Sequence, residues 1–162
     1  MTKTIFHGDA KVDRTFRRGP FSVDEEEDNV DGGGEGVKAM ATILVVDDDR
    51  QICALLKQVL EEQGYTVEIA LNGIEGISRY RTHPADLIIL DILMPEKEGL
   101  ETILDLRREF PKIKIIAMSG GSERAKLNLL DLARRLGAQY TVNKPFELQT
   151  ITDLVKKALQ ED

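Results

Sequence analysis

The sequence predicts an α/β fold: a doubly wound, five-stranded parallel sheet built from five strand–helix units, (βα)₅. Two observations support this prediction. Short apolar runs alternate with segments in which apolar residues recur at helical spacing. The central runs are apolar throughout, as in parallel strands covered by helices on both faces. Because crossovers between parallel strands are right-handed, few strand orders remain, and we expect 2-1-3-4-5, with the first and third strands side by side.

Five segments are predicted to be strands. In chain order they are residues 43–46, 65–69, 87–90, 113–118 and 140–143. The second segment alternates between polar and apolar residues, as a strand near the edge of a sheet does. The third contains only Leu and Ile, so we expect it at the centre of the sheet.

A helix is expected after each strand. The apolar residues that indicate these helices are Ile52, Leu55, Leu56, Val59 and Leu60; Ile74 and Ile77; Leu100, Ile103 and Leu104; Leu127, Leu130, Ala133 and Leu136; and Ile151, Leu154, Val155, Ala158 and Leu159. The expected helix ends are Gly64, His83-Pro84, Pro111 and Gly137. Glycine favours the left-handed conformation that closes a helix, and proline interrupts one.

Length and composition limit the chain to one main domain and exclude several functions. With 162 residues, 41% of them hydrophobic, the chain can bury one core. The formal net charge of −7 disfavours binding to DNA or to anionic membranes. The single cysteine, Cys53, cannot form an intramolecular disulfide and is expected to pack in the core. Since no apolar stretch resembles a membrane span or a signal peptide, we expect a cytoplasmic protein with neither nucleic acid nor membrane as a partner.

Residues 1–40 are predicted to be a disordered extension, and residues 41–162 the folded domain. Residues 1–39 contain nine acidic and six basic residues and show no sustained apolar period. Such a segment cannot bury enough apolar surface to offset the entropy lost on ordering. Two interpretations stay open: translation starts at Met40, or the extension is a genuine flexible tail that serves as an interaction arm.

Residues suited to phosphoryl transfer directly follow four of the predicted strands. They are Asp47, Asp48 and Asp49 after the first strand, Asp91 after the third, Ser119 at the end of the fourth and Lys144 after the fifth. Because the carboxyl ends of parallel strands meet at one edge of the sheet, carboxylates, a hydroxyl and an ammonium should converge there. The expected strand order brings Asp47, Asp48 and Asp91 together.

Each of these residues also has an ordinary structural interpretation. An Asp after a strand often caps the next helix, and we assign this role to Asp49. Taken alone, Asp91, Ser119 and Lys144 fit turn or surface positions, but their joint placement favours a functional site. His83 lies in a loop before a proline, and we expect it to be exposed and without a role.

Residues 41–162 resemble the receiver domain of two-component response regulators, specifically the stand-alone, chemotaxis-type kind. The resemblance rests on the acidic strand end at 43–49, the phosphoacceptor segment at 86–95, Met118-Ser119-Gly120-Gly121 and Asn143-Lys144-Pro145-Phe146. It implies a flavodoxin-like fold. Each motif alone is a weak signal, but together and in this order they are specific.

The resemblance implies that Asp91 is the phosphorylation site. Asp91 would take a phosphoryl group from the phosphohistidine of a histidine kinase or a histidine phosphotransfer protein and become an acyl phosphate. The implied cofactor is Mg²⁺, which prefers octahedral oxygen coordination. Its implied ligands are Asp47, Asp48, Asp91 and the backbone carbonyl of Leu93, with Asp47 acting largely through a bound water.

The resemblance also assigns roles to the residues on the fourth and fifth strands. Lys144, directed by a cis peptide before Pro145, would pair with one phosphoryl oxygen, and the Ser119 hydroxyl would bind another. Together with Asp91, these two residues form the implied catalytic set. The implied switch pair is Ser119 and Thr141. Many receivers have an aromatic residue where this chain has Thr141, whereas Tyr140 should face the opposite side of the sheet.

The same resemblance predicts that the acyl phosphate is lost slowly. In this family, the residues two after the phosphoacceptor and two after the hydroxyl residue flank the approach of the hydrolytic water. Here they are Leu93 and Gly121, neither of which has a side chain that can orient water. We therefore expect a domain that catalyses its own phosphorylation and slow autodephosphorylation, and that is not a turnover enzyme.

Two functions remain open. The first is a response regulator that signals through a separate partner protein, because no output module follows the last expected helix. The second is a phosphoryl carrier or phosphate sink within a relay. An enzyme of the haloacid-dehalogenase type also uses a nucleophilic Asp, but it needs a second acid two residues later, where this chain has Leu93.

Overall fold

The computed structural model describes residues 40–94, 99–121 and 123–161. The predicted extension therefore lies outside the described residues except for Met40. The strands are β1 (Thr42–Val46), β2 (Thr66–Ala70), β3 (Leu87–Asp91), β4 (Ile115–Ser119) and β5 (Tyr140–Asn143). The helices are α1 (Arg50–Glu62), α2 (Gly73–Thr82), α3 (Gly99–Glu109), α4 (Glu123–Leu136) and α5 (Leu148–Gln160). Strands and helices alternate throughout, as predicted.

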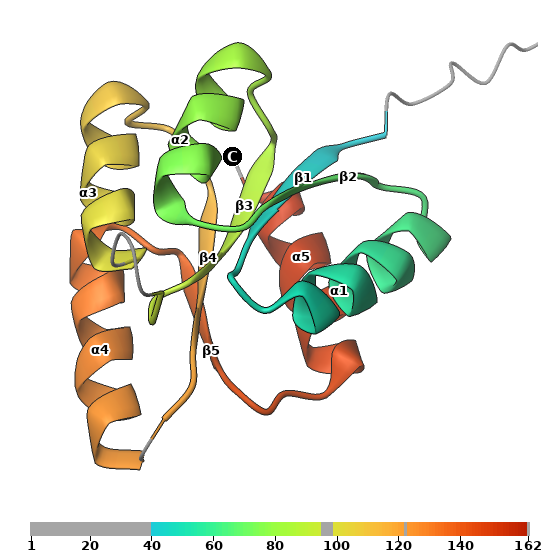
Figure 1. Ribbon diagram of the computed structural model, residues 1–162. Helices are drawn as coiled ribbons and strands as arrows, with labels where there is room; N and C mark the ends of the chain where they lie inside the picture. The colour runs from blue at the N-terminus through green and yellow to red at the C-terminus, as the bar shows by residue number, and fades with distance from the viewer. Residues whose placement is uncertain (1–39, 95–98, 122, 162) are drawn as a thin grey trace, which may run out of the picture. The chain divides into compact units, whose positions relative to one another are not determined.

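The five strands form one parallel sheet in the order β2-β1-β3-β4-β5, which confirms the predicted topology (Figure 1). The register aligns the carboxyl ends of the central strands. Val46 pairs with Leu90, Asp91 with Met118, and Ser119 with Asn143. Residues that follow these strands are therefore neighbours at one edge of the sheet.

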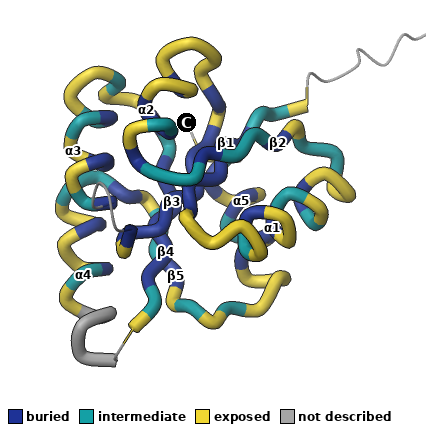
Figure 2. Tube along the Cα trace, in the orientation of Figure 1, coloured by how far each residue is buried: buried dark blue, intermediate teal, exposed yellow. Residues whose placement is uncertain are grey.

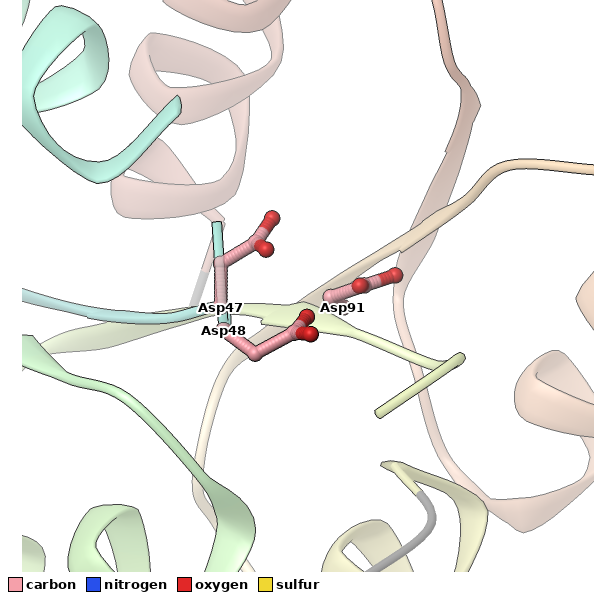
Figure 3. Close-up of side chains that lie close together, drawn as sticks. All are labelled: Asp47, Asp48 and Asp91. Atoms are coloured by element: carbon pink, nitrogen blue, oxygen red, sulfur yellow. The ribbon is translucent and has the colours of Figure 1, made fainter. Parts of the chain in front are cut away.

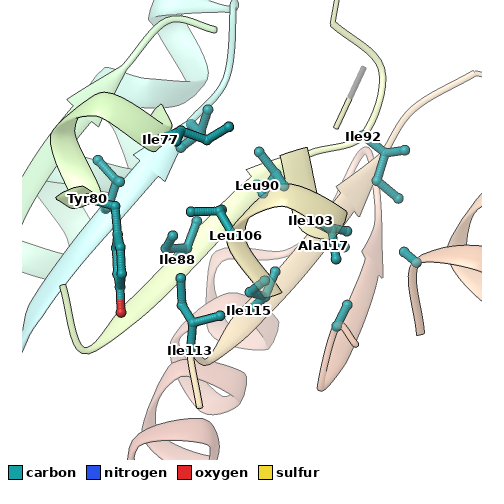
Figure 4. Packing of buried hydrophobic residues seen from close by; sticks show 14 of the residues in the cluster. Ile77, Tyr80, Ile88, Leu90, Ile92, Ile103, Leu106, Ile113, Ile115 and Ala117 are labelled. Atoms are coloured by element: carbon teal, nitrogen blue, oxygen red, sulfur yellow. The ribbon is translucent and has the colours of Figure 1, made fainter. Parts of the chain in front are cut away.

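Each central strand sends alternate residues into two separate cores, one on each face of the sheet. One core includes Leu44, Ile88 and Ile115, the last two labelled in Figure 4, and is covered by α2, α3 and α4 (Figure 1). The other includes Ile43 and Ile89 and is covered by α1 and α5. Because both faces are covered, the central strands are buried along their whole length (Figure 2).

Helix ends follow the predicted signals. Asp49 is the N-cap of α1, and its carboxylate accepts hydrogen bonds from the N–H groups of Gln51 and Ile52 at 2.8 and 3.4 Å. Gly64 and Gly137 have φ angles of 92° and 116°, the left-handed conformation that ends a helix at little cost in glycine. The structural role predicted for Asp49 is thus confirmed.

Some apolar residues expected on buried stripes are exposed. Leu55, Ile74 and Leu104 lie on the solvent side of their helices. Each is next in the sequence to a buried or partly buried apolar residue or a glycine. Successive residues of a helix point in directions about 100° apart, so a residue next to a buried one can face solvent. Ile113 lies just before β4 rather than in it, although its side chain is buried.

None of the helices in the described part of the chain combines the length and the hydropathy needed to cross a bilayer.

Candidate functional site

Three carboxylates gather where β1 and β3 end. Asp47 and Asp48 directly follow β1, and Asp91 is the last residue of β3 (Figure 3). One carboxylate oxygen from each lies within 4.8 Å of the others. Asp47 and Asp91 are buried, whereas Asp48 is exposed. The cluster is therefore accessible to solvent from the side of Asp48.

Asp47 is held from several directions. Its N–H donates to the carbonyl of Ala70 on the neighbouring strand at 3.1 Å. One carboxylate oxygen accepts from the N–H of Asp49 at 2.9 Å, and the other accepts from the Lys144 ammonium at 2.6 Å. Cys53 packs below it, and the thiol donates to the Asp47 carbonyl at 3.3 Å. Asp47 is fully buried, so these contacts fix its carboxylate in one position.

Asp91 is the second buried carboxylate of the cluster. It accepts a hydrogen bond from the N–H of Leu93 at 3.3 Å, and the Lys144 ammonium is 3.3 Å from its second carboxylate oxygen. Burial, followed by the nearby negative charge of Asp47, raises the pKa of Asp91 to about 6, although Lys144 acts in the opposite direction. Positive charge at this site would favour the ionised carboxylate.

Lys144 reaches the two buried carboxylates from the end of β5. Its backbone N–H donates to the Ser119 carbonyl at 2.8 Å, which extends the pairing of β4 and β5, and the bond from Lys144 to Pro145 is cis, as predicted. Burial alone would lower the pKa of the ammonium, but the hydrogen bonds and charges of Asp47 and Asp91 outweigh it and raise this pKa. Lys144 is therefore charged.

Ser119 ends β4 beside Asp91's strand. Its side chain is buried, and its hydroxyl donates to the carbonyl of the adjacent Gly120 at 3.3 Å, a long hydrogen bond. The hydroxyl is thus held weakly compared with the carboxylates of the site.

Thr141 and Tyr140 face opposite sides of the sheet, as predicted. Thr141 pairs with Ala117 in the register of β4 and β5. Tyr140 is partly buried and packs against the core on the side of α5, where its hydroxyl donates to Glu161 at 2.5 Å and the Lys157 ammonium lies 5.1 Å from the ring centre. Tyr140 is therefore not available on the side of Thr141.

Leu93 and Gly121 lie next to each other, near the carboxylate cluster and on its solvent-exposed side. A Cβ added to Gly121 would lie 3.6 Å from Leu93 Cδ1, and 46% of Leu93 is exposed. No side chain at either position can hydrogen-bond to water. The direction of the Leu93 carbonyl, and hence its expected role as a metal ligand, stays a prediction.

Asp47, Asp48 and Asp91 fit a small divalent cation. All their ligand atoms are oxygens, which Mg²⁺ prefers, and two carboxylates are buried close together with a single ammonium between them. The separations are within reach of one shared ion. Because Asp48 is exposed, solvent reaches the cluster from its side.

The remaining residues with structural interpretations lie where expected. Cys53 is buried, and burial, followed by the charge of Asp47, raises its thiol pKa to about 11, so it is unreactive. His83 is exposed at the end of α2.

Gly99 was not singled out from the sequence, although a Cβ there would lie 2.3 Å from the Asp91 carbonyl oxygen. The only signal in the sequence is a glycine at the start of an apolar helical stripe.

A doubly wound parallel sheet whose switch point between β1 and β3 carries three clustered carboxylates, reached by a lysine from β5, is typical of α/β domains that bind their ligands at the carboxyl ends of the strands. Residues 43–156 match the family model described as the response regulator receiver domain. The chain belongs to this family, whose domains are signalling modules of two-component systems.

Three relatives illustrate the likeness. The transcriptional regulatory protein CpxR of Escherichia coli is 33% identical over 121 residues, which are 75% of this chain and 50% of CpxR. The chain thus spans about half the length of this relative. Sporulation initiation phosphotransferase F of Bacillus subtilis is 32% identical over 117 residues, covering 72% of this chain and 92% of the relative. The crystal structure of the response regulator TrrA from Thermotoga maritima, in complex with Mg²⁺-BeF, is 36% identical with a TM-score of 0.65, covering 74% and 99%.

Proposed function

We propose that this domain accepts a phosphoryl group from the phosphohistidine of a kinase or phosphotransfer protein onto Asp91, and that the phosphorylated form signals to a partner protein. One observation carries the proposal. The Lys144 ammonium lies 2.6 Å from Asp47 and 3.3 Å from Asp91, inside a cluster of three carboxylates at the carboxyl edge of the sheet. Such a site combines a nucleophilic oxygen with positive charge for the transferred group.

In the proposed reaction, a carboxylate oxygen of Asp91 forms a bond to phosphorus. The phosphorus–nitrogen bond of the donor breaks, and its electron pair returns to the imidazole nitrogen, which takes a proton from water. Lys144 and the Ser119 hydroxyl bind phosphoryl oxygens, so their weak or shared contacts in the unphosphorylated site are exchanged for contacts with the phosphoryl group.

Asp47, Asp48 and Asp91 would hold Mg²⁺, with the Leu93 carbonyl as a further proposed ligand. The ion supplies positive charge that neutralises the phosphoryl oxygens during transfer. The site supports this assignment because its donors are oxygens alone. The TrrA structure contains Mg²⁺ and a beryllium fluoride group in a protein 36% identical to this chain.

The proposal is tested by labelling with a small phosphodonor and Mg²⁺. We expect Asp91→Asn to abolish labelling while the circular dichroism spectrum is unchanged, because the nucleophile is removed and the side-chain volume kept. Asp48→Ala should weaken both Mg²⁺ binding and labelling, roughly tenfold or more, since it removes a direct ligand.

Asp49→Ala is the matched control. It removes the adjacent carboxylate, which caps α1 and lies outside the cluster, so we expect some loss of stability but retained labelling. Labelling of Asp91→Asn at another acid would refute the assignment of the phosphoacceptor. Unchanged Mg²⁺ affinity in Asp48→Ala would refute its role as a ligand.

A relay function is the second candidate. It is favoured by the similarity to sporulation initiation phosphotransferase F, which is covered over 92% of its length. In that case the domain would pass its phosphoryl group on to a second histidine. Incubating purified phosphorylated domain with a histidine phosphotransfer protein distinguishes the two functions. Rapid transfer supports a carrier, whereas persistence of the acyl phosphate supports a signalling form.

A further inference from the structure

A cavity of about 560 Å³ lies at the edge of the sheet where the strands begin, opposite the carboxylate cluster. Its volume is in the range of small-molecule sites. The lining side chains come from residues just before β1, β2, β3 and β4 and from the carboxyl-terminal part of α5. They include Met40, Tyr65, Asp86, Lys114, Lys156 and Leu159. The cavity shares no residue with the proposed phosphorylation site.

Part of the cavity wall is apolar. Met40 is 53% exposed, and the end of its side chain lies against Gly64, where α1 ends. Tyr65 and Leu159 are partly buried and pack against the core on the side of α1 and α5. A ligand with an apolar group would remove more of this surface from water, which is favourable. The cavity is therefore suited to a molecule that has an apolar portion.

Two charged groups of the cavity are held in place by backbone hydrogen bonds. The Asp86 carboxylate accepts from the Thr42 N–H at 2.7 Å, and the Asp86 N–H donates to the Thr42 carbonyl at 2.8 Å. The Lys114 ammonium donates to the carbonyl of Glu161, the residue that follows α5. A negative and a positive group are thus positioned by different chain segments before any ligand binds, which lowers the entropy cost of binding.

The opposite charges of the cavity do not neutralise each other directly. Within the described part of the chain, neither Lys114 nor Lys156 forms an ion pair with Asp86, and the Lys156 ammonium has no partner at all. The Tyr65 hydroxyl also has no hydrogen-bond partner among the described residues. A ligand that is only an anion would meet Asp86, and one that is only a cation would meet the lysines. A ligand that carries both charges complements both.

We propose that this cavity binds a small zwitterion with an apolar side chain, which is the chemistry of a free apolar amino acid. The ligand carboxylate lies beside Lys156 and Lys114, its ammonium beside Asp86, and its side chain against Met40 and Leu159. The proposal goes beyond phosphoryl transfer and does not depend on it. Binding joins the carboxyl end of α5 to the residues that begin β1 and β3, and so stabilises the folded domain by mass action.

The test follows the backbone amide signals of the full chain by NMR during a titration with L-leucine at pH 7. We expect saturable shifts at Ala41, Tyr65 and Leu159, with a Kd of about 1 mM for so small a ligand, and no shifts at Asp48 and Leu93 on the other edge. Isocaproate lacks the ammonium of leucine, and isoamylamine lacks its carboxylate. Each should bind at least about fivefold more weakly than leucine, because one charge of the cavity stays uncompensated.

Several results would overturn the proposal. They are the absence of saturable shifts with leucine, shifts centred on another part of the domain, and equal affinity for leucine and either of the singly charged probes. Shifts of the same amides that depend on protein concentration, without any probe, would show that a second copy of the chain covers the cavity instead.

Two variants test the charges separately. Asp86→Asn keeps an oxygen that can accept from Thr42, and Lys156→Gln removes a charge that has no partner among the described residues. Each should weaken leucine binding about fivefold. Asp86→Asn should not weaken isocaproate, and Lys156→Gln should not weaken isoamylamine, because each probe lacks the group that the variant no longer attracts. A loss of fold would instead weaken all three probes.

Asp131→Asn and Lys112→Gln are the matched controls. Both native residues are exposed and lie outside the cavity, and each variant removes the same kind of charge as its test variant. We expect both to bind leucine as the unchanged protein does. If the controls weaken leucine as much as Asp86→Asn and Lys156→Gln, the effect is one of net charge and the cavity is not the site.

Discussion

At the scale of the single residue, the burial of Asp91 beside a second carboxylate opposes its ionisation. The proposed roles of nucleophile and metal ligand require it to be ionised, yet it is buried beside Asp47, and this raises its pKa to about 6. Lys144 relieves the conflict only in part because it is shared between the two carboxylates. The site thus holds excess negative charge that a divalent cation and a phosphoryl group can use, at a cost to the stability of the metal-free protein.

This conflict predicts that Asp91→Asn stabilises the metal-free protein at pH 7. The folded protein binds the proton on Asp91 more tightly than the unfolded chain, whose pKa is near 3.8. The stability gained from this proton is present below that value and lost as the pH rises through about 6. The variant lacks this loss, so its free energy of unfolding should be higher by up to about 3 kcal/mol.

Thermal unfolding in a chelator at several pH values measures this difference. The variant should melt higher than the unchanged protein at pH 7, and the gap should close as the pH falls towards 4. Added Mg²⁺ should raise the melting temperature of the unchanged protein more than that of the variant. A variant that melts lower at pH 7 would show that the ion pair with Lys144 outweighs the burial of the charge.

A second residue-scale prediction concerns Leu93 and the lifetime of the acyl phosphate. Leu93 and Gly121 lie together at the rim, and neither offers a hydrogen bond to an attacking water. Leu93→Asn should therefore speed the loss of phosphate roughly tenfold, since an amide can orient that water. The measurement is the decay of phosphorylated protein after the donor is removed.

Leu104→Asn is a suitable control, because Leu104 is 43% exposed, close to the 46% of Leu93, but lies on the outer side of α3. It should leave the decay unchanged. Loss of phosphate within seconds in the unchanged protein, or equal decay in Leu93→Asn, would contradict this explanation of the lifetime.

Among the secondary-structure elements, the close packing of α3 against the end of β3 sets the position of Asp91. A Cβ on Gly99 would lie 2.3 Å from the Asp91 carbonyl oxygen and 2.5 Å from Ile92 Cα, both backbone atoms. The Gly99 N–H also donates to the Ile92 carbonyl at 2.9 Å. A glycine at the start of α3 therefore lets the helix lie directly against the end of the strand that carries Asp91, the proposed phosphoacceptor.

We predict that Gly99→Ala lowers the free energy of unfolding by about 2 kcal/mol or more and weakens Mg²⁺ binding, because backbone atoms must move to make room. Chemical denaturation and a Mg²⁺ titration measure the two effects. Gly120→Ala is the control, since a Cβ there has its nearest neighbours at 3.8 Å, an ordinary contact. Equal stability of the two variants would show that α3 can shift freely.

The whole molecule places its chemistry where the strand order changes direction. Chain segments far apart in the sequence, ending at Asp47, Asp91, Ser119 and Lys144, meet at one edge of the sheet, while two cores below them hold the strands in register. Among the described residues, the side chains of both cores come from the segment between β1 and α5.

From this we predict that a chain beginning at Met40 melts within a few degrees of the full chain and is labelled by a phosphodonor equally well. The composition of residues 1–39 offers no apolar face to pack. Thermal unfolding of the two chains side by side measures the difference. A large drop in melting temperature on removal of residues 1–39 would show that the extension docks on the domain.

The sequence by itself determined the fold class, the strand order and the residues of the acidic cluster. Local signals are sufficient for these features, because apolar periodicity defines each element and right-handed crossovers restrict how the elements assemble. Strand ends then place Asp47, Asp48 and Asp91 together without any knowledge of packing. The cap role of Asp49 also follows from its position alone.

Only the tertiary structure decided the contacts that depend on distances between segments. The sharing of Lys144 between two carboxylates, the fit of Gly99 under Asp91 and the binding of Gly137 by Arg107 each join residues remote in sequence. The same holds for the exposure of Leu55 and Ile74, which periodicity placed on buried stripes. Periodicity specifies the direction of a helix face, whereas burial and hydrogen bonding depend on which atoms of other segments lie opposite it.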